Sequence, residues 1–174
     1  MKYADVYNLP ENWRTEFEYL LLRAQDDKTL RKAYICSPCR ADSTAGVYAN
    51  MLAARFYMHY AFTNMRLYPY APHATLPVIL NDRVLCERNL ALDFGKELLN
   101  AVDEMLVCGQ NLSDGMRGEI IRAVELNIPV SVFSFYLYER IREITDSPQI
   151  RYDDKHLPLL FVAGDLSDSK EVSA

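Results

Sequence analysis

The stretch MLVCGQNLSDGMRGEI, residues 105–120, decides the fold class of this chain. Residues 105–108 have the length and composition of a buried strand, and Ser113 stands where a helix would begin. In an open α/β sheet, ligands bind beyond the carboxyl ends of the strands, where a helix N-terminus offers backbone N–H groups. We therefore expect a ligand-binding turn here, with Glu119 one to two turns inside the helix.

Glu119 is expected at the edge of the helix face that packs on the sheet. Apolar residues recur on that face at three- and four-residue spacing, namely Met116, Ile120, Ala123 and Val124. A carboxylate at this edge, near the helix start, is partly desolvated, which suits a nucleophile. The plainer interpretation is a helix-flank glutamate that pairs with Arg122 or is favoured by the positive helix end. The helix alone leaves both interpretations open.

Strand-like and helix-like segments alternate along most of the chain. The expected strands are residues 33–36, 66–70, 102–108 and 128–132, and the expected helices are residues 44–62, 87–101 and the helix from about Ser113. This alternation predicts a doubly wound, mainly parallel α/β sheet of four or five strands flanked by helices, a Rossmann- or flavodoxin-like three-layer fold. Pro69 suits only the end or the edge of such a sheet.

Three further expectations concern element faces and the C-terminal part of the chain. The helix at 87–101 is expected to share one face among Leu90, Phe94, Leu98 and Ala101. Residues 136–142 are compatible with a helix, and residues 157–162 with either a last strand or an apolar tail segment. Asn127 is expected to end the Glu119 helix.

The length of 174 residues fits one domain with a substantial core. We expect this α/β domain to span residues 31–165, with a disordered tail over residues 166–174. Residues 1–30 read as an N-terminal helical extension, because Trp13 and Phe17 begin an apolar series at helical spacing. That apolar face would cap the core or a neighbouring subunit.

Composition and charge argue against two classes of binding partner, nucleic-acid polymers and membranes. The net charge of −5 argues against a binder of nucleic-acid polymers, whose affinity comes from clustered Lys and Arg, but leaves nucleotide-sized ligands open. No apolar run approaches the roughly 18 residues that a membrane span needs, and the N-terminus lacks the basic and apolar regions of a signal peptide. We expect a cytoplasmic protein without membrane contact.

The four cysteines are expected to be free thiols, because a domain of this size needs no disulfides and nothing marks secretion. Cys36-Ser37-Pro38-Cys39 has the spacing of redox and metal motifs. In a thioredoxin-like site, however, the first cysteine begins a helix, whereas Cys36 ends a strand-like run. A structural zinc would need a second ligand pair, which the sequence does not offer at a recognised spacing.

Three segments in order along the chain carry a family resemblance: YICSPCR at 34–40, APH at 71–73 and SDGMRGEIIRA at 113–123. Together they resemble the nucleoside 2-deoxyribosyltransferase-like superfamily. The match is to an uncharacterised branch frequent in phage and other mobile elements, whose pattern is strand-SPxR, PH and SxGMxxEIxxA. The resemblance covers roughly residues 32–132 and implies the same doubly wound fold.

The resemblance implies a catalytic role for Glu119. In characterised members, the glutamate of the last motif attacks the anomeric carbon of a deoxyribonucleoside, expels the base and later passes the sugar to another base or to water. This is a retaining glycosyl transfer through a covalent intermediate, and it implies no metal and no organic cofactor. Tyr34 matches a tyrosine that could orient the glutamate.

The resemblance also implies a binding end of the site. As in nucleotide-cleaving relatives, Ser113 and Gly115 could present a hydroxyl and a backbone N–H to a 5′-phosphate. Arg40 could add charge-assisted hydrogen bonds from the first loop. Ser37 and Met116 belong to the same motifs and are expected at the substrate.

One departure concerns the aspartate with which the transferases contact the base. Counting back from Asp103 places Gly95 at that position. The acid is either missing or supplied by His73, Asp82 or Asp93. An imidazole after Pro72 could act as acid or base near neutral pH, while an ordinary loop histidine bonded to backbone is an equal interpretation.

Charged residues beyond the second loop have a plainer interpretation. Arg83, Glu87 and Arg88 open a helix there and could face the site, but a solvated charged turn is the favoured account.

Three functional hypotheses follow. The first is an enzyme that acts on the N-glycosidic bond of a nucleoside or nucleotide, a 2-deoxyribosyltransferase or a hydrolase. The second is a non-catalytic nucleotide-binding or sensing module, which the absent aspartate favours. The third, a purely structural interaction protein, is disfavoured because Ser113, Gly115 and Glu119 are retained. We expect a homodimer or higher homo-oligomer in each case, because apolar and aromatic segments exceed what one small sheet needs.

Overall fold

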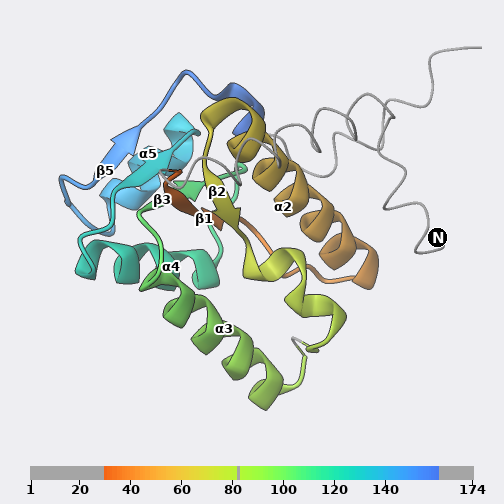
Figure 1. The fold of residues 1–174 in the computed structure, drawn as a ribbon. Coiled ribbons are helices and arrows are strands. Elements are labelled where there is room, and N and C mark those ends of the chain that lie inside the picture. The colour runs from red at the N-terminus through yellow and green to blue at the C-terminus, as the bar shows by residue number, and fades with distance from the viewer. Residues whose placement is uncertain (1–29, 82, 161–174) are drawn as a thin grey trace, which may run out of the picture. The chain divides into compact units, whose positions relative to one another are not determined.

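The computed structural model describes residues 30–81 and 83–160. The predicted N-terminal helix, the predicted tail and Asp82 lie outside these residues. The described residues contain one sheet of order β2-β1-β3-β4-β5, in which every neighbouring pair is parallel (Figure 1). Its strands are β1 Lys32–Cys36, β2 Tyr68–Tyr70, β3 Glu104–Val107, β4 Val130–Val132 and β5 Ile150–Tyr152. The predicted doubly wound α/β fold is confirmed.

Helices cover both faces of the sheet. The α-helices are α2 Thr44–Met65, α3 Leu85–Leu99, α4 Asp114–Glu125 and α5 Phe135–Arg142, and the short 3-10 helices are η2 Pro72–Ala74, η3 Leu76–Val78 and η4 Leu157–Leu160. Buried side chains of α3, α4 and α5 form one core cluster, and those of α2 and η4 form the other. Strand β1 serves both clusters, because side chains alternate across a strand: Tyr34 and Cys36 face the first cluster, whereas Ala33 and Ile35 face the second.

The strand order places the ligand-binding edge of the sheet beside residues 105–120. The chain runs outward from β1 to β2 and then returns across β1 to β3, so the order reverses between β1 and β3. Parallel sheets bind ligands at such a switch point, beyond the carboxyl ends of the strands. The loops after Cys36 and after Val107 therefore flank the expected ligand position.

Helix α4 begins and ends as its sequence predicts. The Ser113 hydroxyl caps the helix and accepts a hydrogen bond from the Met116 N–H at 3.3 Å. Asn127 follows the last turn with φ +58°, a left-handed conformation that asparagine tolerates at a helix end. These two ends fix the register of the helix, and thereby the direction in which Glu119 points.

Two expectations about strands turn out differently from each other. Pro69 lies in β2, which is an edge strand, as its missing N–H requires. Residues 157–162 were expected to hold a last strand or an apolar tail segment, but residues 157–160 form a 3-10 helix and Ile150–Tyr152 forms the fifth strand. A strand over residues 157–160 is therefore wrong, and residues 161–162 lie outside the described residues. Strand β5 carries little hydrophobic signal in the sequence, because it is short and mostly exposed.

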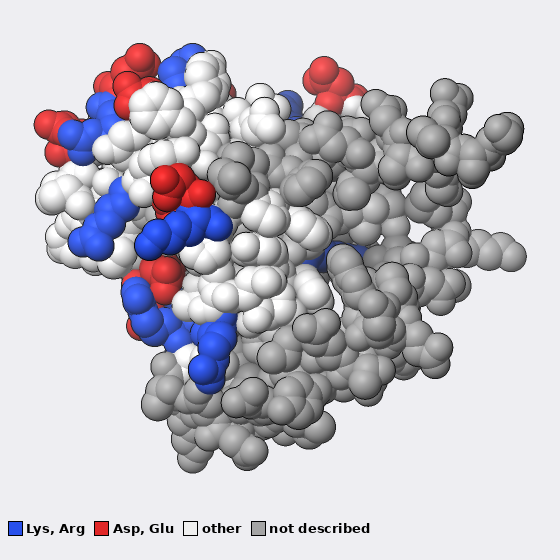
Figure 2. All heavy atoms as spheres, turned by 90° about the horizontal axis from the view of Figure 1, so that it is seen from above, with Lys and Arg blue, Asp and Glu red and all other residues white. Residues whose placement is uncertain are grey.

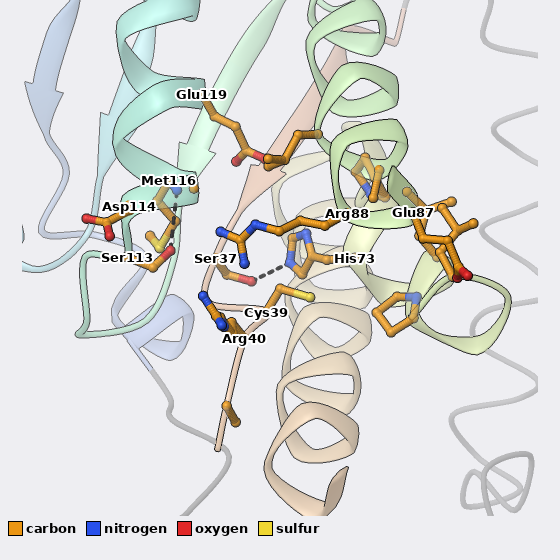
Figure 3. Close-up of a pocket in the computed structure, with 18 of the residues that line it drawn as sticks. Ser37, Cys39, Arg40, His73, Glu87, Arg88, Ser113, Asp114, Met116 and Glu119 are labelled. Carbon is orange, nitrogen blue, oxygen red and sulfur yellow. Dashed lines mark hydrogen bonds between the residues drawn. The ribbon is translucent and has the colours of Figure 1, made fainter. Parts of the chain in front are cut away.

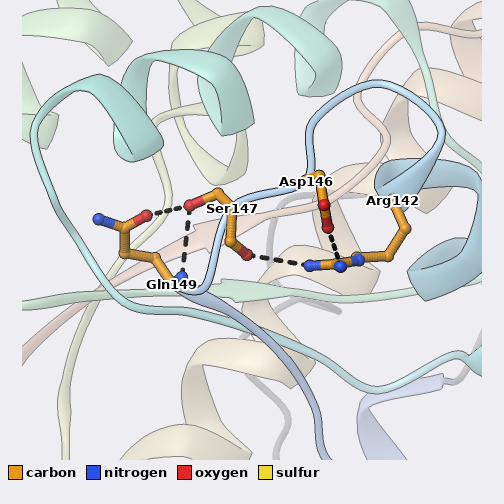
Figure 4. Close-up of polar contacts among 4 residues, drawn as sticks. All are labelled: Arg142, Asp146, Ser147 and Gln149. Atoms are coloured by element: carbon orange, nitrogen blue, oxygen red, sulfur yellow. Dashed lines mark hydrogen bonds and ion pairs between the residues drawn. The ribbon is translucent and has the colours of Figure 1, made fainter.

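Polar contacts in the connection before β5 hold this edge strand (Figure 4). Arg142 forms an ion pair with Asp146, and its guanidinium donates to the Ser147 carbonyl at 3.2 Å. The side chains of Ser147 and Gln149 are hydrogen bonded, and the Gln149 amide donates to Asn127 Oδ1 at 2.9 Å. The connection is thus tied to the turn that ends α4.

The apolar residues expected to share a face of α3 are buried to different extents. Leu90 and Phe94 are 58% and 52% exposed, Leu98 is partly buried, and the buried residues of the helix are Gly95 and Leu99. The sequence does not reveal this buried side, because a glycine contributes nothing to a hydrophobic pattern. Gly95 nevertheless faces the sheet, where a side chain would not fit.

Candidate functional site

A pocket of about 440 Å³ lies at the carboxyl ends of β1 and β3 (Figure 3). Its walls come from the β1–α2 loop, from η2 and η3, from the first half of α3 and from the N-terminus of α4. The predicted site residues that line it are Tyr34, Ser37, Arg40, His73, Ser113, Gly115, Met116 and Glu119. Segments up to 85 residues apart in sequence are therefore brought to one cavity. Of the predicted residues that the structure describes, Asp93 is left outside it, and Asp82 is not among the described residues.

The Glu119 carboxyl lies deep in this pocket and is held by Tyr34. The fully buried Tyr34 hydroxyl donates a hydrogen bond to Glu119 Oε1 at 2.8 Å. Burial disfavours the charged carboxylate and raises its pKa to about 7, although hydrogen bonds from Tyr34 and Cys36 lower that pKa in part. The phenol stays neutral, because burial and the neighbouring carboxylate both raise the pKa of Tyr34. A carboxylate that ionises near neutral pH is available as a nucleophile or base.

A second buried pair consists of Ser37 and His73. Ser37 Oγ and His73 Nε2 are 2.7 Å apart, and both side chains are buried. Burial lowers the pKa of His73 to about 4, so the imidazole is neutral near pH 7. His73 therefore bonds to a side chain of the pocket, and its neutral ring can accept or relay a proton but holds no stored proton to deliver.

Two guanidinium groups point into the pocket from opposite walls (Figure 3). Arg40 comes from the β1–α2 loop and Arg88 from α3. The acidic residues at the rim are directed elsewhere: the Asp114 carboxylate is fully exposed, 3.9 Å from the Arg117 guanidinium, and Glu87 accepts a hydrogen bond from the Asn81 N–H at 2.6 Å. The two guanidinium groups are suited to contact an anionic group at this end of the pocket, which Asp42 also lines.

The N-terminus of α4 adds neutral donors at the same end. Ser113 caps the Met116 N–H, while Asp114 and Gly115 occupy the first helical positions, whose N–H groups have no partner within a helix. Such a terminus carries the positive end of the helix dipole. The arginines and this terminus together form a polar end of the pocket.

The structure does not bring Asp93 to the pocket. It lies on the exposed side of α3, where its carboxylate forms an ion pair with Lys96 at 3.3 Å. Asp93 and Gly95 differ by roughly 200° around a helix, since each residue turns the chain by about 100°. Gly95 instead lies against the Tyr34–Glu119 pair: a Cβ there would be 2.9 Å from Tyr34 Oη and 3.5 Å from Glu119 Oε1.

Sequence reasoning missed several pocket residues. Arg88 was interpreted as part of a solvated turn, but it lines the cavity. Cys36 does not line the cavity but lies beside Glu119, and the strand alternation from Tyr34 could have placed it there. Other missed residues form apolar wall, namely Leu76, Pro77, Leu80, Ala91, Leu92 and Leu112; their sequence pattern carries no signal that would separate a pocket wall from a core.

The described residues also bear on metal, thiol and membrane chemistry. All four cysteines lie in this part of the chain and carry thiols rather than disulfides. Among residues 30–81 and 83–160, no three His, Cys, Asp or Glu side chains gather as metal ligands. No helix in the same residues has both the length and the apolar character to cross a membrane. On the face in Figure 2, acidic and basic side chains lie interspersed.

The order of the strands and the position of the pocket define this protein as a doubly wound α/β domain with a ligand cavity at the β1/β3 switch point. The chain belongs to the family described as domain of unknown function DUF7768, which its residues 31–133 match. This range includes strands β1 to β4 and every residue that lines the pocket. No curated protein and no solved structure matches the chain.

Proposed function

We propose that this protein is a nucleoside or nucleotide N-glycosidic-bond enzyme, a 2-deoxyribosyltransferase or an N-glycoside hydrolase. One observation carries the proposal: the half-buried Glu119 carboxyl lines a nucleotide-sized pocket, and Tyr34 fixes one of its oxygens at 2.8 Å. A carboxylate with a fixed orientation in a pocket is the group that a retaining glycosyl transfer needs.

In the proposed reaction, the ionised Glu119 attacks the anomeric carbon of the sugar. The bond from that carbon to the base nitrogen breaks, its electron pair leaves with the base, and an ester joins Glu119 to the sugar. Water or a second base then attacks the same carbon and releases the carboxylate. Tyr34 holds Oε1 throughout, so the second carboxylate oxygen is the one directed at the sugar.

The Ser37–His73 pair is proposed to contact the leaving base. One hydrogen of the pair is used in the bond between Ser37 and His73, and the other, on the hydroxyl or on the imidazole according to the tautomer, is proposed to donate to the base and to stabilise the negative charge that develops as the glycosidic bond breaks. The proton that the base finally needs comes from water, because His73 holds no stored proton near neutral pH. This arrangement replaces the base-contacting aspartate, whose position is occupied by Gly95.

Arg40, Arg88 and the N-terminus of α4 favour a substrate with a 5′-phosphate. A substitution of Arg88 tests this preference. Arg88→Gln should raise KM for a nucleoside 5′-monophosphate by about 10- to 100-fold, since a charge-assisted hydrogen bond contributes about 1.5–3 kcal/mol. The KM for the nucleoside should change little. Arg83→Gln is the matched control, because Arg83 donates to the Asp42 carbonyl and lies outside this pocket. Equal losses for both substrates would contradict a phosphate contact.

The direct test is incubation of the protein with ribo- and deoxyribonucleosides and their 5′-monophosphates, with and without a second free base. Chromatography should show free base or an exchanged nucleoside. Free base alone defines a hydrolase, and an exchanged nucleoside defines a transferase.

A non-catalytic nucleotide sensor is the second candidate, favoured by one observation: Gly95 leaves the pocket without the usual base-contacting acid. A sensor should melt at a higher temperature with a nucleotide and leave that nucleotide chemically unchanged over hours. An enzyme should convert it under the same conditions.

We also propose that the protein forms a homodimer through the apolar segment 78–94. Large apolar side chains are exposed along it, namely Val78, Ile79, Val84, Leu85, Leu90 and Phe94. Exposed apolar surface of this kind is typical of an interface. Light scattering at micromolar concentration should give a dimeric mass, and Phe94→Asp should weaken the dimer by about 30-fold or more, as a central contact would. Ile121→Asp on α4 is the control, and a monomeric wild-type mass would contradict the proposal.

A further inference from the structure

Gly95 is the buried glycine of α3 and faces the Tyr34–Glu119 pair. A Cβ at this position would lie 2.9 Å from Tyr34 Oη, closer than Cβ atoms come to other atoms in proteins. The same Cβ would lie 3.5 Å from Glu119 Oε1, which is an ordinary van der Waals contact. A side chain here would therefore displace the tyrosine hydroxyl and leave the carboxylate itself unobstructed.

The close approach of the Tyr34 hydroxyl to the helix accounts for a glycine at position 95. Glycine in the interior of a helix is less favourable than alanine. Gly95 does not need its conformational freedom, since the described glycine with positive φ is Gly109. Gly118, inside α4, has no atom within 4 Å of its would-be Cβ, so it provides a helix glycine without a close neighbour for comparison.

We propose that Gly95 is a positioning residue for the reaction, because its missing side chain lets the Tyr34 hydroxyl reach Glu119 Oε1. The proposal rests on the proposed function, in which Glu119 is the nucleophile. Gly95 acts through Tyr34, which is fully buried and whose hydroxyl donates to Glu119. The position where the transferases contact the base thus serves, in this chain, to orient the nucleophile.

The test is a double-mutant cycle of Gly95→Ala and Tyr34→Phe, with Gly118→Ala as control. Gly95→Ala should lower kcat by about tenfold or more with little change in KM, and Tyr34→Phe should do the same, since each removes one hydrogen bond to a carboxylate. Adding Gly95→Ala to Tyr34→Phe should cost little more, because the clashing hydroxyl is already absent. Gly118→Ala should leave kcat unchanged.

Two readouts do not depend on activity. In protein labelled with ¹³C at glutamate carboxyls, the pKa of Glu119 should rise in Gly95→Ala and in Tyr34→Phe alike, because both lose a bond to the charged form. The melting temperature should fall for Gly95→Ala and recover when Tyr34→Phe is added. If Gly95→Ala fails to fold, a folded double variant supports the contact.

Additive losses in kcat, or an unchanged Glu119 pKa in Gly95→Ala, would overturn the proposal. So would failure of both Gly95→Ala and the double variant to fold, since Gly95 would then serve packing alone. The proposed function fails separately, if the wild-type protein cleaves no nucleoside or nucleotide. In that case the pKa and melting measurements still decide whether Gly95 positions the pair.

Discussion

Glu119→Gln is expected to lower the kcat of base release by at least about a thousandfold, the scale of losing a nucleophile. An amide cannot form the ester with the sugar. The fold should survive, because the glutamine oxygen still accepts the Tyr34 hydrogen bond and the variant buries no charge. Product formation by chromatography and circular dichroism measure the two effects.

Glu125→Gln is the matched control for this variant. Glu125 lies on the same helix, is exposed and pairs with Arg122 at 3.0 Å, so its replacement should leave kcat unchanged. Base release by Glu119→Gln at the wild-type rate would exclude Glu119 as the nucleophile. A variant that binds nucleotide but releases no base would agree with the proposed reaction.

The rate of base release should rise with pH by about fiftyfold between pH 5 and pH 7 and level off above pH 8. The cause is the Glu119 pKa of about 7: at pH 5 nearly all of the carboxyl is protonated and unable to attack. His73 imposes no opposing loss in this range, because burial lowers its pKa to about 4. A kcat profile that is flat from pH 5 to 8 would contradict a nucleophile with this pKa.

The same two residues have opposite effects on the free energy of unfolding. The folded-state pKa of Glu119 is raised above 4.5, so its stabilising contribution is present below pH 4.5 and is lost as pH rises through about 7. The folded-state pKa of His73 is lowered from 6.5, so its contribution is present above pH 6.5 and is lost as pH falls through about 4. Between pH 4.5 and 6.5 the two slopes oppose each other.

Removing the Glu119 carboxyl should therefore reveal the pH dependence of the unfolding free energy that His73 contributes. Urea unfolding of Glu119→Gln should show stability that rises with pH across this window, whereas the wild-type protein should change less. An identical pH dependence in both proteins would mean that burial does not raise the pKa of Glu119.

The sequence predicts the parts of the fold that repeat a strong local pattern. The alternation of strands and helices predicts the doubly wound sheet, and Ser113 and Asn127 predict the two ends of α4. Local patterns also place Tyr34 within the first strand and Glu119 on a helix. The shared pocket follows from the parallel order of the strands, since their carboxyl ends meet at one edge.

The buried side of α3 and part of the site depend on contacts between residues far apart in sequence, which a local sequence pattern cannot predict. Gly95 packs against the Tyr34 hydroxyl, and this contact between distant residues is not visible in the sequence. The larger Leu90 and Phe94 dominate the hydrophobic pattern of the helix, although both are exposed. The Ser37–His73 pair joins two loops 36 residues apart. Arg88 enters the pocket only because α3 crosses above it, and a charged helix start is ordinarily a solvated turn.

Strand β1 contributes side chains to both core clusters, so we expect its residues to tolerate substitution less well than the residues of the pocket wall. Tyr34 and Cys36 contribute to the site and to one core cluster, and the intervening Ile35 belongs to the other cluster. A substitution in this strand is therefore a substitution in the core. Most apolar residues of the pocket wall lie outside the sheet instead, on η3, on the loop after it and on the first half of α3. We therefore expect ligand preference to change through substitutions in this wall, whereas a substitution of Tyr34 or Cys36 would disturb the site and the core together.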